Sequence, residues 1–282
     1  MIIGNKVFDV ENRTYIMGIL NVTPDSFSDG GSYNSIDKAL MQVEKMINEG
    51  MDIVDIGGES TRPGYIQVSE EEEISRVVPV IEGIKKNFDI PISVDTYKSK
   101  VAFASIEAGA DLINDIWGCK YDKEMAKIIA DSGVACCLMH NRDIATNPYT
   151  DFIEDVMLDL RESVNLACNA GVAGDKIIID SGVGFGKTYE ENLIVLNQLH
   201  RFNEFKLPVL LGTSRKSVIG NTLNLEVEDR LEGTLATTAL GVMKGCTFVR
   251  VHDVKENKRV VRMLEAVKSV NTKNNKTILT YK

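Results

Sequence analysis

One stretch, residues 91–115, decides the fold and reads PISVDTYKSKVAFASIEAGADLIND. A short apolar run, Ile92–Asp95, precedes helical spacing over Val101–Gly109, and a second apolar run, Asp111–Asn114, follows. The glycine that closes the helical segment is a typical helix stop. Neither apolar run alternates strictly with polar residues, as expected of parallel strands that are covered on both faces. The stretch therefore predicts one strand–helix–strand unit of a parallel sheet.

Units of this kind recur along the chain at intervals of roughly 20 to 40 residues, the length of a βα unit. The predicted strands are Tyr15–Leu20, Asp52–Ile56, Ile92–Asp95, Asp111–Asn114, Val134–Met139, Lys176–Asp180, Val209–Gly212 and Thr247–Val251. The predicted helices are Asp37–Glu49, a segment opened by a Ser69–Glu72 capping box, Val101–Gly109, Lys123–Gly133, Phe152–Gly171, Glu190–Phe202, Arg230–Gly245 and Lys255–Val270. This order predicts an α/β fold, a single (β/α)₈ TIM barrel, with an open doubly wound sheet as the alternative.

The two ends of the chain are expected to behave differently. Ile2–Asp9 predicts a short N-terminal hairpin that turns at Gly4-Asn5 and closes the bottom of the barrel. The tail after Val270 is expected to fray. Because the chain has no linker or low-complexity block, residues 1–282 are expected to form one domain with a core of about residues 14–270.

Composition narrows the class of protein. The net charge of −9 argues against a nucleic-acid groove or an anionic membrane surface as partner. No apolar stretch approaches the roughly 20 residues of a membrane span, and the N-terminus has no signal pattern, so we expect a cytoplasmic protein. The five cysteines form no CxxC pair and are expected to be reduced and mostly buried.

Almost every predicted strand ends in a side chain that can hydrogen-bond or ionise. These positions are Asn21, Glu59, Asp95, Asn114, Asp115, His140, Asp180, Thr213, Ser214, Arg250 and His252. In a TIM barrel the carboxyl ends of the strands form the active-site face. Because burying such groups without partners is costly, the pattern predicts a polar ligand there.

One cluster at this face suits an anion. The last strand pairs with the first in a closed barrel, which places Asn21 beside Arg250 and His252, and these two lie on the same face of their strand. Phosphate sites commonly lie at the loops after strands 7 and 8 of such barrels, and here the strand-7 loop carries Ser214–Ser217, with two basic residues. We therefore expect a phosphate or diphosphate site, with Mg²⁺ held through the carbonyl oxygen of Asn21.

A second cluster suits a flat heterocycle. Asp95, Asn114, Asp180 and Lys216 combine carboxylates, an amide and an ammonium, which match the edge of a ring with adjacent amino and lactam groups. The residues alone predict a phosphorylated polar aromatic ligand. A Schiff-base role for Lys216 is the alternative.

Three other features favour ordinary structural roles. Gly182–Thr188 is similar to a P-loop, but Ser181 stands where the first glycine should be, so we expect a loop that brings backbone close to a ligand. His140 is expected to be a structural histidine outside the site. The acidic run Glu70–Glu73 is expected to be a solvated helix start, favoured by the helix dipole.

On these residues the chain resembles the dihydropteroate synthases. Residues 18–31, GILNVTPDSFSDGG, and 55–64, DIGGESTRPG, are similar to the two long signatures of that family. Shorter similarities follow in chain order at Ser93–Thr96, Ile113–Ile116, Leu138–His140, Gly184–Lys187, Ser214–Ser217 and Arg250–Asp253. The chain departs from the family pattern at Ser181, where proline is usual, and at Asn141–Asp143.

The resemblance implies a folate-synthesis transferase that condenses (7,8-dihydropterin-6-yl)methyl diphosphate with 4-aminobenzoate, releasing diphosphate. It implies a cytoplasmic homodimer, dependent on Mg²⁺ and targeted by sulfonamides. The implied pterin-binding residues are Asp95, Asn114, Met139, Asp180, Gly212 and Lys216. The implied diphosphate-binding residues are Asn21, Thr61, Arg250 and His252, with Mg²⁺ at Asn21. The implied aminobenzoate residues are Phe27, Arg62, Pro63 and Ser217, mostly in loops after the first two strands. The implied catalytic residues are Asp95, Lys216, Arg250 and His252.

Two other functions fit a pterin-binding barrel. Methyltetrahydrofolate methyltransferases share the pterin-binding carboxylates, but they need neither a diphosphate site nor the long loop after the first strand. A non-catalytic pterin-binding protein has no use for a leaving-group site. Lys216, Arg250 and both loop sequences favour the synthase.

Overall fold

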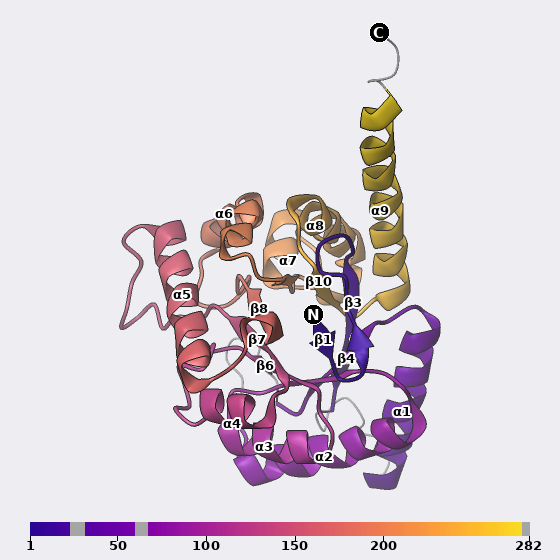
Figure 1. Ribbon diagram of the computed structural model, residues 1–282, viewed down its shortest axis with the longest axis vertical. Coiled ribbons are helices and arrows are strands. Elements are labelled where there is room, and N and C mark those ends of the chain that lie inside the picture. The colour runs from indigo at the N-terminus through magenta and orange to yellow at the C-terminus, as the bar shows by residue number, and fades with distance from the viewer. Residues whose placement is uncertain (23–31, 60–66, 278–282) are drawn as a thin grey trace.

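Eight parallel strands close into a barrel that helices surround (Figure 1). The computed structural model describes residues 1–22, 32–59 and 67–277. The barrel strands are β3 (Tyr15–Asn21), β4 (Ile53–Gly57), β5 (Ile92–Asp95), β6 (Leu112–Asp115), β7 (Ala135–Met139), β8 (Ile177–Asp180), β9 (Val209–Leu211) and β10 (Phe248–Val251). They are arranged in chain order, and β10 pairs with β3. This closure confirms the predicted TIM barrel and excludes the open sheet.

The helices lie between the strands, as the sequence predicts, but the first begins at Ser32 instead of Asp37, and a short additional helix, Ser217–Leu223, precedes the predicted Arg230–Gly245 helix. They are α1 (Ser32–Asn48), α2 (Glu70–Asn87), α3 (Ser99–Glu107), α4 (Met125–Ser132), α5 (Phe152–Ala170), α6 (Tyr189–Asn197), α7 (Ser217–Leu223), α8 (Leu231–Lys244) and α9 (Val254–Thr277). Among the described residues, no helix is long and apolar enough to span a membrane. All five cysteines are free thiols, and only Cys168 is exposed.

Two predicted helix ends are wrong. The helix expected over Glu190–Phe202 stops at Asn197, and a 3₁₀ helix follows over Leu199–Phe205. Its three-residue period turns Leu199 and Phe202, both fully buried, to the same side. The expected fraying after Val270 is also wrong, because α9 continues to Thr277 and projects away from the barrel (Figure 1). No glycine or proline interrupts that segment.

The N-terminal hairpin is confirmed and lies across the centre of the barrel in Figure 1. Strands β1 (Ile2–Ile3) and β2 (Lys6–Val7) pair antiparallel around the turn. After the hairpin, the ring of Phe8 packs 4.8 Å from that of Tyr15 and 5.8 Å from that of Phe248. Since Tyr15 and Phe248 begin their strands, the hairpin and its flanking residue close the amino end of the barrel.

The barrel interior changes character along the strands. Side chains that share a face recur every second residue. Near the amino end the inner positions are apolar, namely Met17, Ile53, Leu112, Ala135, Cys137, Ile178 and Leu210. Two residues after an inward-facing residue of the same strand, and so on the same face, stand Asp55, Asp95, Asn114, Asp180 and Arg250. The polar site therefore lies on an apolar floor at the carboxyl end.

Candidate active site

The register of the strands brings the predicted residues to one level of the barrel. Asn21 is the neighbour of Gly57, Gly57 of Asp95, and Asp95 of Asn114. Asp180 ends β8 on the other side of the barrel. Partners in register point to the same face of a sheet. These residues, which lie far apart in the sequence, therefore share the carboxyl end of the barrel.

Arg250 is the centre of a buried ion cluster. Its Nε donates to Asp55 Oδ2 at 2.5 Å, and its Nη2 donates to Asp95 Oδ2 at 2.7 Å. The Ser93 hydroxyl donates to Asp55 Oδ1 at 2.5 Å, and the Asn114 amide donates to Asp55 Oδ2 at 3.4 Å. The side chain of Arg250 is 19% exposed and that of Asp55 is fully buried. One guanidinium therefore compensates two carboxylates inside the barrel.

Asp55 was missed by sequence reasoning, which considered only the residues at strand ends. It lies within β4, two residues before Gly57, and so it faces the barrel interior with that glycine. A carboxylate inside an otherwise apolar strand was the available signal. The predicted diphosphate cluster and the predicted pterin cluster are therefore joined, because Arg250 of the first contacts Asp95 of the second.

The carboxyl group of Asp95 is both perturbed and incompletely paired. Burial and the nearby Asp55 carboxylate raise the pKa of Asp95 to about 7, although Arg250 acts in the opposite direction. Its Oδ1 atom is buried and has no hydrogen-bond partner within the described part of the chain. A buried acceptor without a donor is costly. Such an atom suits a ligand that supplies an N–H group.

Asp180 and Lys216 form the opposite side of the site. The Gly182 amide donates to Asp180 Oδ1 at 2.8 Å. The Lys216 ammonium donates to the Val183 carbonyl and lies 4.6 Å from the centre of the Phe185 ring. Burial raises the pKa of Asp180 and lowers that of Lys216 to about 8, and each charge opposes the shift of the other. This side therefore offers an acceptor and a cation close together.

An apolar wall lies beside these polar groups. Met139, at the end of β7, is buried against Tyr97 and Ile116, with Trp117 and Phe185 packed on the same cluster. Aromatic and thioether surfaces suit the face of a flat ring, while carboxylates and amides suit its edge. The wall and the polar groups together match a polar heterocycle.

Gly212 provides the room between the two charged groups. A methyl group at this position would lie 3.8 Å from Asp180 Oδ2 and 3.9 Å from both Lys216 Nζ and Arg250 Cβ. These are ordinary contacts, so alanine fits the chain. A larger side chain would occupy the space between the carboxylate and the ammonium.

Gly212→Val is therefore expected to weaken ligand binding without unfolding the protein. Overfilling a packed space costs about 1–3 kcal/mol, which corresponds to about a five- to 150-fold weaker complex. Titration calorimetry with a pterin ligand would measure this, with Gly212→Ala as the matched control. Valine and alanine variants that bind equally well would show that the ligand does not lie beside Gly212.

His252 and the loop after β9 are tied together. Nδ1 of His252 lies 2.9 Å from the hydroxyl oxygen of Ser214, which also accepts the His252 amide at 3.2 Å. Arg215 makes two hydrogen bonds to Asp253, of 3.1 Å and 2.6 Å. Arg215 is one of the two basic residues of the loop Ser214–Ser217, but its charge is compensated by Asp253. His252 thus stands at the carboxyl end of β10 in a fixed position.

The stems of the loop between β4 and α2 are joined by a buried ion cluster. Nζ of Lys98 donates to Glu59 at 2.5 Å, to Glu73 at 2.7 Å and to the Val68 carbonyl at 2.8 Å. The Val68 amide donates to Glu59 Oε2 at 3.0 Å. The expectation of a solvated Glu73 is wrong, because its side chain is 1% exposed. Glu73 lies one helical turn before the buried Val77 and so shares the face of α2 that packs against the barrel.

Several predicted residues cannot be placed. Phe27, Thr61, Arg62 and Pro63 lie outside the described residues. The roles of these four residues stay predictions. Ser217 is described and begins α7, directly after Lys216.

Comparison with known proteins places the chain in a family. The sequence profile of the family described as pterin binding enzyme matches residues 17–252. This range begins at the third residue of β3 and includes the other seven barrel strands completely. The dihydropteroate synthase of Clostridium beijerinckii is 61% identical over 268 residues, 95% of this chain and 99% of that protein. The chain belongs to the dihydropteroate synthase family. As a member, it is a transferase of folate biosynthesis.

Solved structures of dihydropteroate synthases have the same fold. The Clostridium difficile enzyme, determined in the presence of pteroic acid, has a TM-score of 0.90 and 50% identity, over 93% of this chain and 99% of that one. The Yersinia pestis enzyme with a sulfonamide has a TM-score of 0.88 and 40% identity, over 96% of this chain and 99% of that one. The fold and function implied by the sequence resemblance are thereby confirmed.

Asn21 is the residue through which the family resemblance implies that Mg²⁺ is held. No group of three or more His, Cys, Asp or Glu residues suited to a metal occurs in the described ranges. Asn21 is exposed at the end of β3, and its amide oxygen lies 3.5 Å from where a methyl group on Gly57 would stand. Mg²⁺ in phosphate-handling sites takes one or two protein ligands and completes its shell with phosphates and water. The site therefore fits a magnesium ion that arrives with a diphosphate.

Proposed function

We propose that this dihydropteroate synthase-family enzyme joins (7,8-dihydropterin-6-yl)methyl diphosphate to 4-aminobenzoate, forming 7,8-dihydropteroate and diphosphate. The observation that carries the proposal is the buried cluster of Asp55, Asp95 and Arg250, whose Asp95 Oδ1 has no partner within the described chain. The pteroic acid of the Clostridium difficile structure supports it, since that molecule joins a pterin to aminobenzoate.

The pterin ring is proposed to lie between Asp95 and Asp180. Both carboxylates are acceptors for the amino and ring N–H groups of a pterin, and Asn114 can both donate and accept. Lys216 would donate to the ring carbonyl or a ring nitrogen. Met139 and Gly212 would then border the ring, Met139 with its apolar surface and Gly212 with the space it leaves.

The diphosphate is proposed to lie over Arg250 and His252, with Asn21 and Thr61 beside it. When the carbon–oxygen bond to the diphosphate breaks, positive charge develops on the pterin methylene and negative charge on the leaving group. Asp95 favours the first, while Arg250 and His252 favour the second. Groups fixed in advance at these positions stabilise the transition state more than the ground state.

Mg²⁺ is proposed to bind through Asn21 together with the diphosphate, and when bound it supplies positive charge to the leaving oxygens. Asn21→Ala is expected to raise the Mg²⁺ concentration needed for half-maximal turnover by about 10- to 100-fold, the size of effect that altered metal surroundings produce. EDTA should stop turnover in both proteins. Asn12→Ala is the control, because Asn12 is exposed before the amino end of the same strand. An unchanged Mg²⁺ requirement in Asn21→Ala would remove Asn21 from the metal site.

Aminobenzoate is proposed to bind against Phe27, Arg62, Pro63 and Ser217, with its amine directed at the pterin methylene. The homodimer and the cytoplasmic location are likewise proposed from the family resemblance.

Product analysis tests the proposed function. The protein is incubated with pterin diphosphate, 4-aminobenzoate and Mg²⁺, and the mixture is analysed by mass spectrometry. Dihydropteroate is the expected product. A parallel incubation with methyltetrahydrofolate and a methyl acceptor should give no demethylation. Demethylation without dihydropteroate would favour the methyltransferase, and binding of pterin without either product would favour a non-catalytic binding protein.

A further inference from the structure

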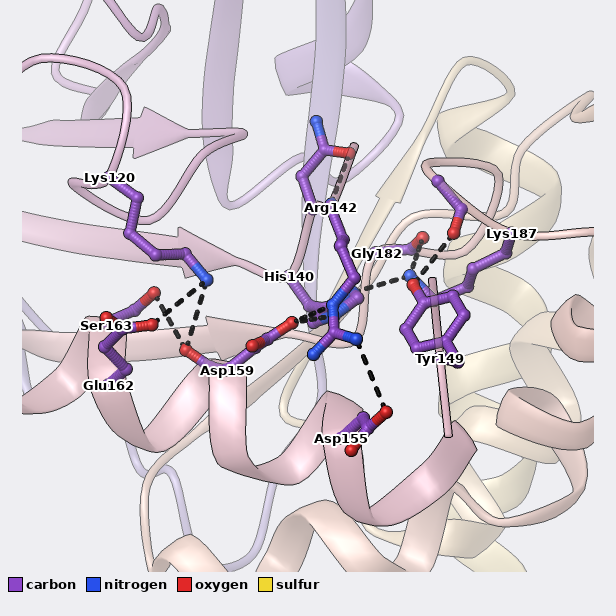
Figure 2. A network of polar contacts seen from close by, with 12 residues as sticks. Lys120, His140, Arg142, Tyr149, Asp155, Asp159, Glu162, Ser163, Gly182 and Lys187 are labelled. Atoms are coloured by element: carbon purple, nitrogen blue, oxygen red, sulfur yellow. Dashed lines mark hydrogen bonds and ion pairs between the residues drawn. The ribbon is translucent and has the colours of Figure 1, made fainter. Parts of the chain in front are cut away.

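A second buried polar network lies directly behind the site, and the proposed function assigns it no role. It joins Lys187, His140, Asp159 and Arg142, from the loop after β8, the end of β7, α5 and the loop after β7 (Figure 2). His140 is fully buried. The sequence predicted a structural histidine here, and its two ring nitrogens are indeed both bonded.

The ammonium group of Lys187 bonds two carbonyls of its own loop and one ring nitrogen of His140. Its Nζ lies 2.7 Å from Nδ1 of His140, 2.9 Å from the Gly182 carbonyl and 3.0 Å from the Phe185 carbonyl. An ammonium group has three N–H donors, and these three acceptors use all of them. The lysine therefore closes the segment 182–187 into a ring around its own side chain.

His140 links Lys187 to Asp159 of α5 through its two ring nitrogens. Since the ammonium can only donate, Nδ1 accepts, and Nε2 carries the proton that it donates to Asp159 Oδ2 at 3.1 Å. The same Oδ2 accepts Nε of Arg142 at 2.8 Å. Burial and the charge of Lys187 lower the pKa of His140 to about 3, so the imidazole is neutral. Burial raises the pKa of Asp159, but the bonds from His140 and Arg142 outweigh this and keep it low.

The other side of the same loop faces the site. The Gly182 amide bonds Asp180, while its carbonyl accepts Lys187. The Phe185 ring lies against the ammonium of Lys216, while its carbonyl also accepts Lys187. Two residues of the loop thus connect the ring around Lys187 to the two proposed pterin contacts.

Two glycines with positive φ angles and close backbone contacts fix the conformation of this loop. Gly182 and Gly186 have φ angles of +68° and +52°, which favour glycine. A methyl group on Gly182 would overlap the His140 carbonyl, and one on Gly186 would overlap the Arg142 carbonyl. The Tyr149 hydroxyl also donates to the Gly186 carbonyl at 2.8 Å. The loop is therefore pressed against residues 140–142, and Lys187 fixes its shape from within.

We propose that Lys187, supported by His140, is a positioning residue that holds the loop after β8 so that Asp180 and Lys216 meet the pterin ring at the correct distance. The inference rests on the proposed function, since it takes Asp180 and Lys216 as pterin contacts. Lys187 itself does not touch the substrate in this account. Burial and the charge of Lys216 lower the pKa of Lys187 to about 7, while the Asp180 carboxylate acts in the opposite direction.

The test compares Lys187→Met with wild type. A displacement of a contact by about 1 Å can cost about a hundredfold in rate, so kcat/KM and pterin affinity should fall by about 10- to 100-fold. Lys176→Met is the matched control. Lys176 lies just before the opposite end of β8, and within the described ranges its ammonium bonds one carbonyl, that of Ile2. Its affinity and activity should stay at the wild-type values. His140→Leu leaves Lys187 its two carbonyl acceptors and should therefore lose less affinity than Lys187→Met.

¹⁵N NMR of the histidine rings supplies a readout that is independent of activity. The chain has three histidines, so the His140 signals can be assigned with the His140→Leu variant. In wild type they should show a neutral ring throughout pH 5 to 9, and at pH 5, where Lys187 is charged, a ring protonated at Nε2. The charged groups around this ring are Lys187, Asp159, Arg142 and Lys120. In Lys187→Met one cation is gone, so the pKa of His140 should rise.

The outcomes separate the inference from the proposed function. Weaker pterin binding by folded Lys187→Met, with a raised His140 pKa and an unchanged control, supports the inference. Wild-type affinity in folded Lys187→Met overturns it. If Lys187→Met does not fold, His140→Leu decides in the same way. A wild-type protein that binds no pterin overturns the proposed function, and the inference with it, whatever the His140 spectrum shows.

Discussion

Replacing Arg250 with methionine is expected to lower kcat/KM by about 100- to 1000-fold, the cost of removing one fixed group that stabilises transition-state charge. The same guanidinium compensates Asp55 and Asp95 at 2.5 Å and 2.7 Å. Breaking a buried ion pair costs about 3–5 kcal/mol of stability. Protonation of Asp95, whose pKa already lies at about 7, should relieve part of this cost.

The stability loss of Arg250→Met should therefore depend on pH. Without the cation, the pKa of Asp95 in the folded protein should rise further above its unfolded value. A group of this kind stabilises the folded state at low pH, and that stability is lost as pH rises through the folded pKa. Denaturant unfolding should show a smaller deficit at pH 5 than at pH 8. Asp55→Asn in the same chain should restore stability but not activity. A deficit that is independent of pH would contradict the ion-cluster account.

Replacing Lys98 with methionine is expected to cost about 3–5 kcal/mol of unfolding free energy, because it leaves two buried carboxylates without a cation. The side chains of Lys98, Glu59 and Glu73 are 5%, 2% and 1% exposed. Burial already raises the pKa of Glu73. Adding Glu73→Gln to Lys98→Met should recover part of the loss, because it removes one of the two uncompensated charges.

Lys100→Met provides the matched control for Lys98→Met. Lys100 pairs with Glu70 at 2.6 Å, but its side chain is 70% exposed. Exposed pairs contribute little to stability, so this variant should unfold close to wild type. The measurement is urea unfolding followed by circular dichroism. Equal unfolding midpoints for the two lysine variants would contradict the account of the loop stems.

The barrel could be predicted because its signals are local. Short apolar strands, helices that end in glycine and polar residues at strand ends each occupy a few consecutive positions. Asp95, Asn114 and Asp180 were predicted in this way to lie at the carboxyl end of the barrel, where the structure places them. The helix ends were predicted less well, since the 3₁₀ helix after Asn197 depends on which side chains the barrel buries.

The missed parts depend on contacts between distant segments. Asp55 is unusual as a carboxylate within an apolar strand, but its partner Arg250 lies 195 positions later. Glu73 belongs to a run that is typical of a solvated helix start, and its burial is decided by Lys98 on another loop. Lys187 follows a glycine-rich segment that favours phosphate binding by composition, yet its ammonium closes that segment on itself.

The central claim is that the polar mouth of this barrel carries both a pterin site and a leaving-group site. Release of diphosphate from pterin diphosphate, measured with and without 4-aminobenzoate in one folded sample whose pterin affinity is known, tests it most directly. The account predicts Mg²⁺-dependent release that requires 4-aminobenzoate and is largely lost in Arg250→Met. No release in a wild-type sample that still binds the pterin would contradict it.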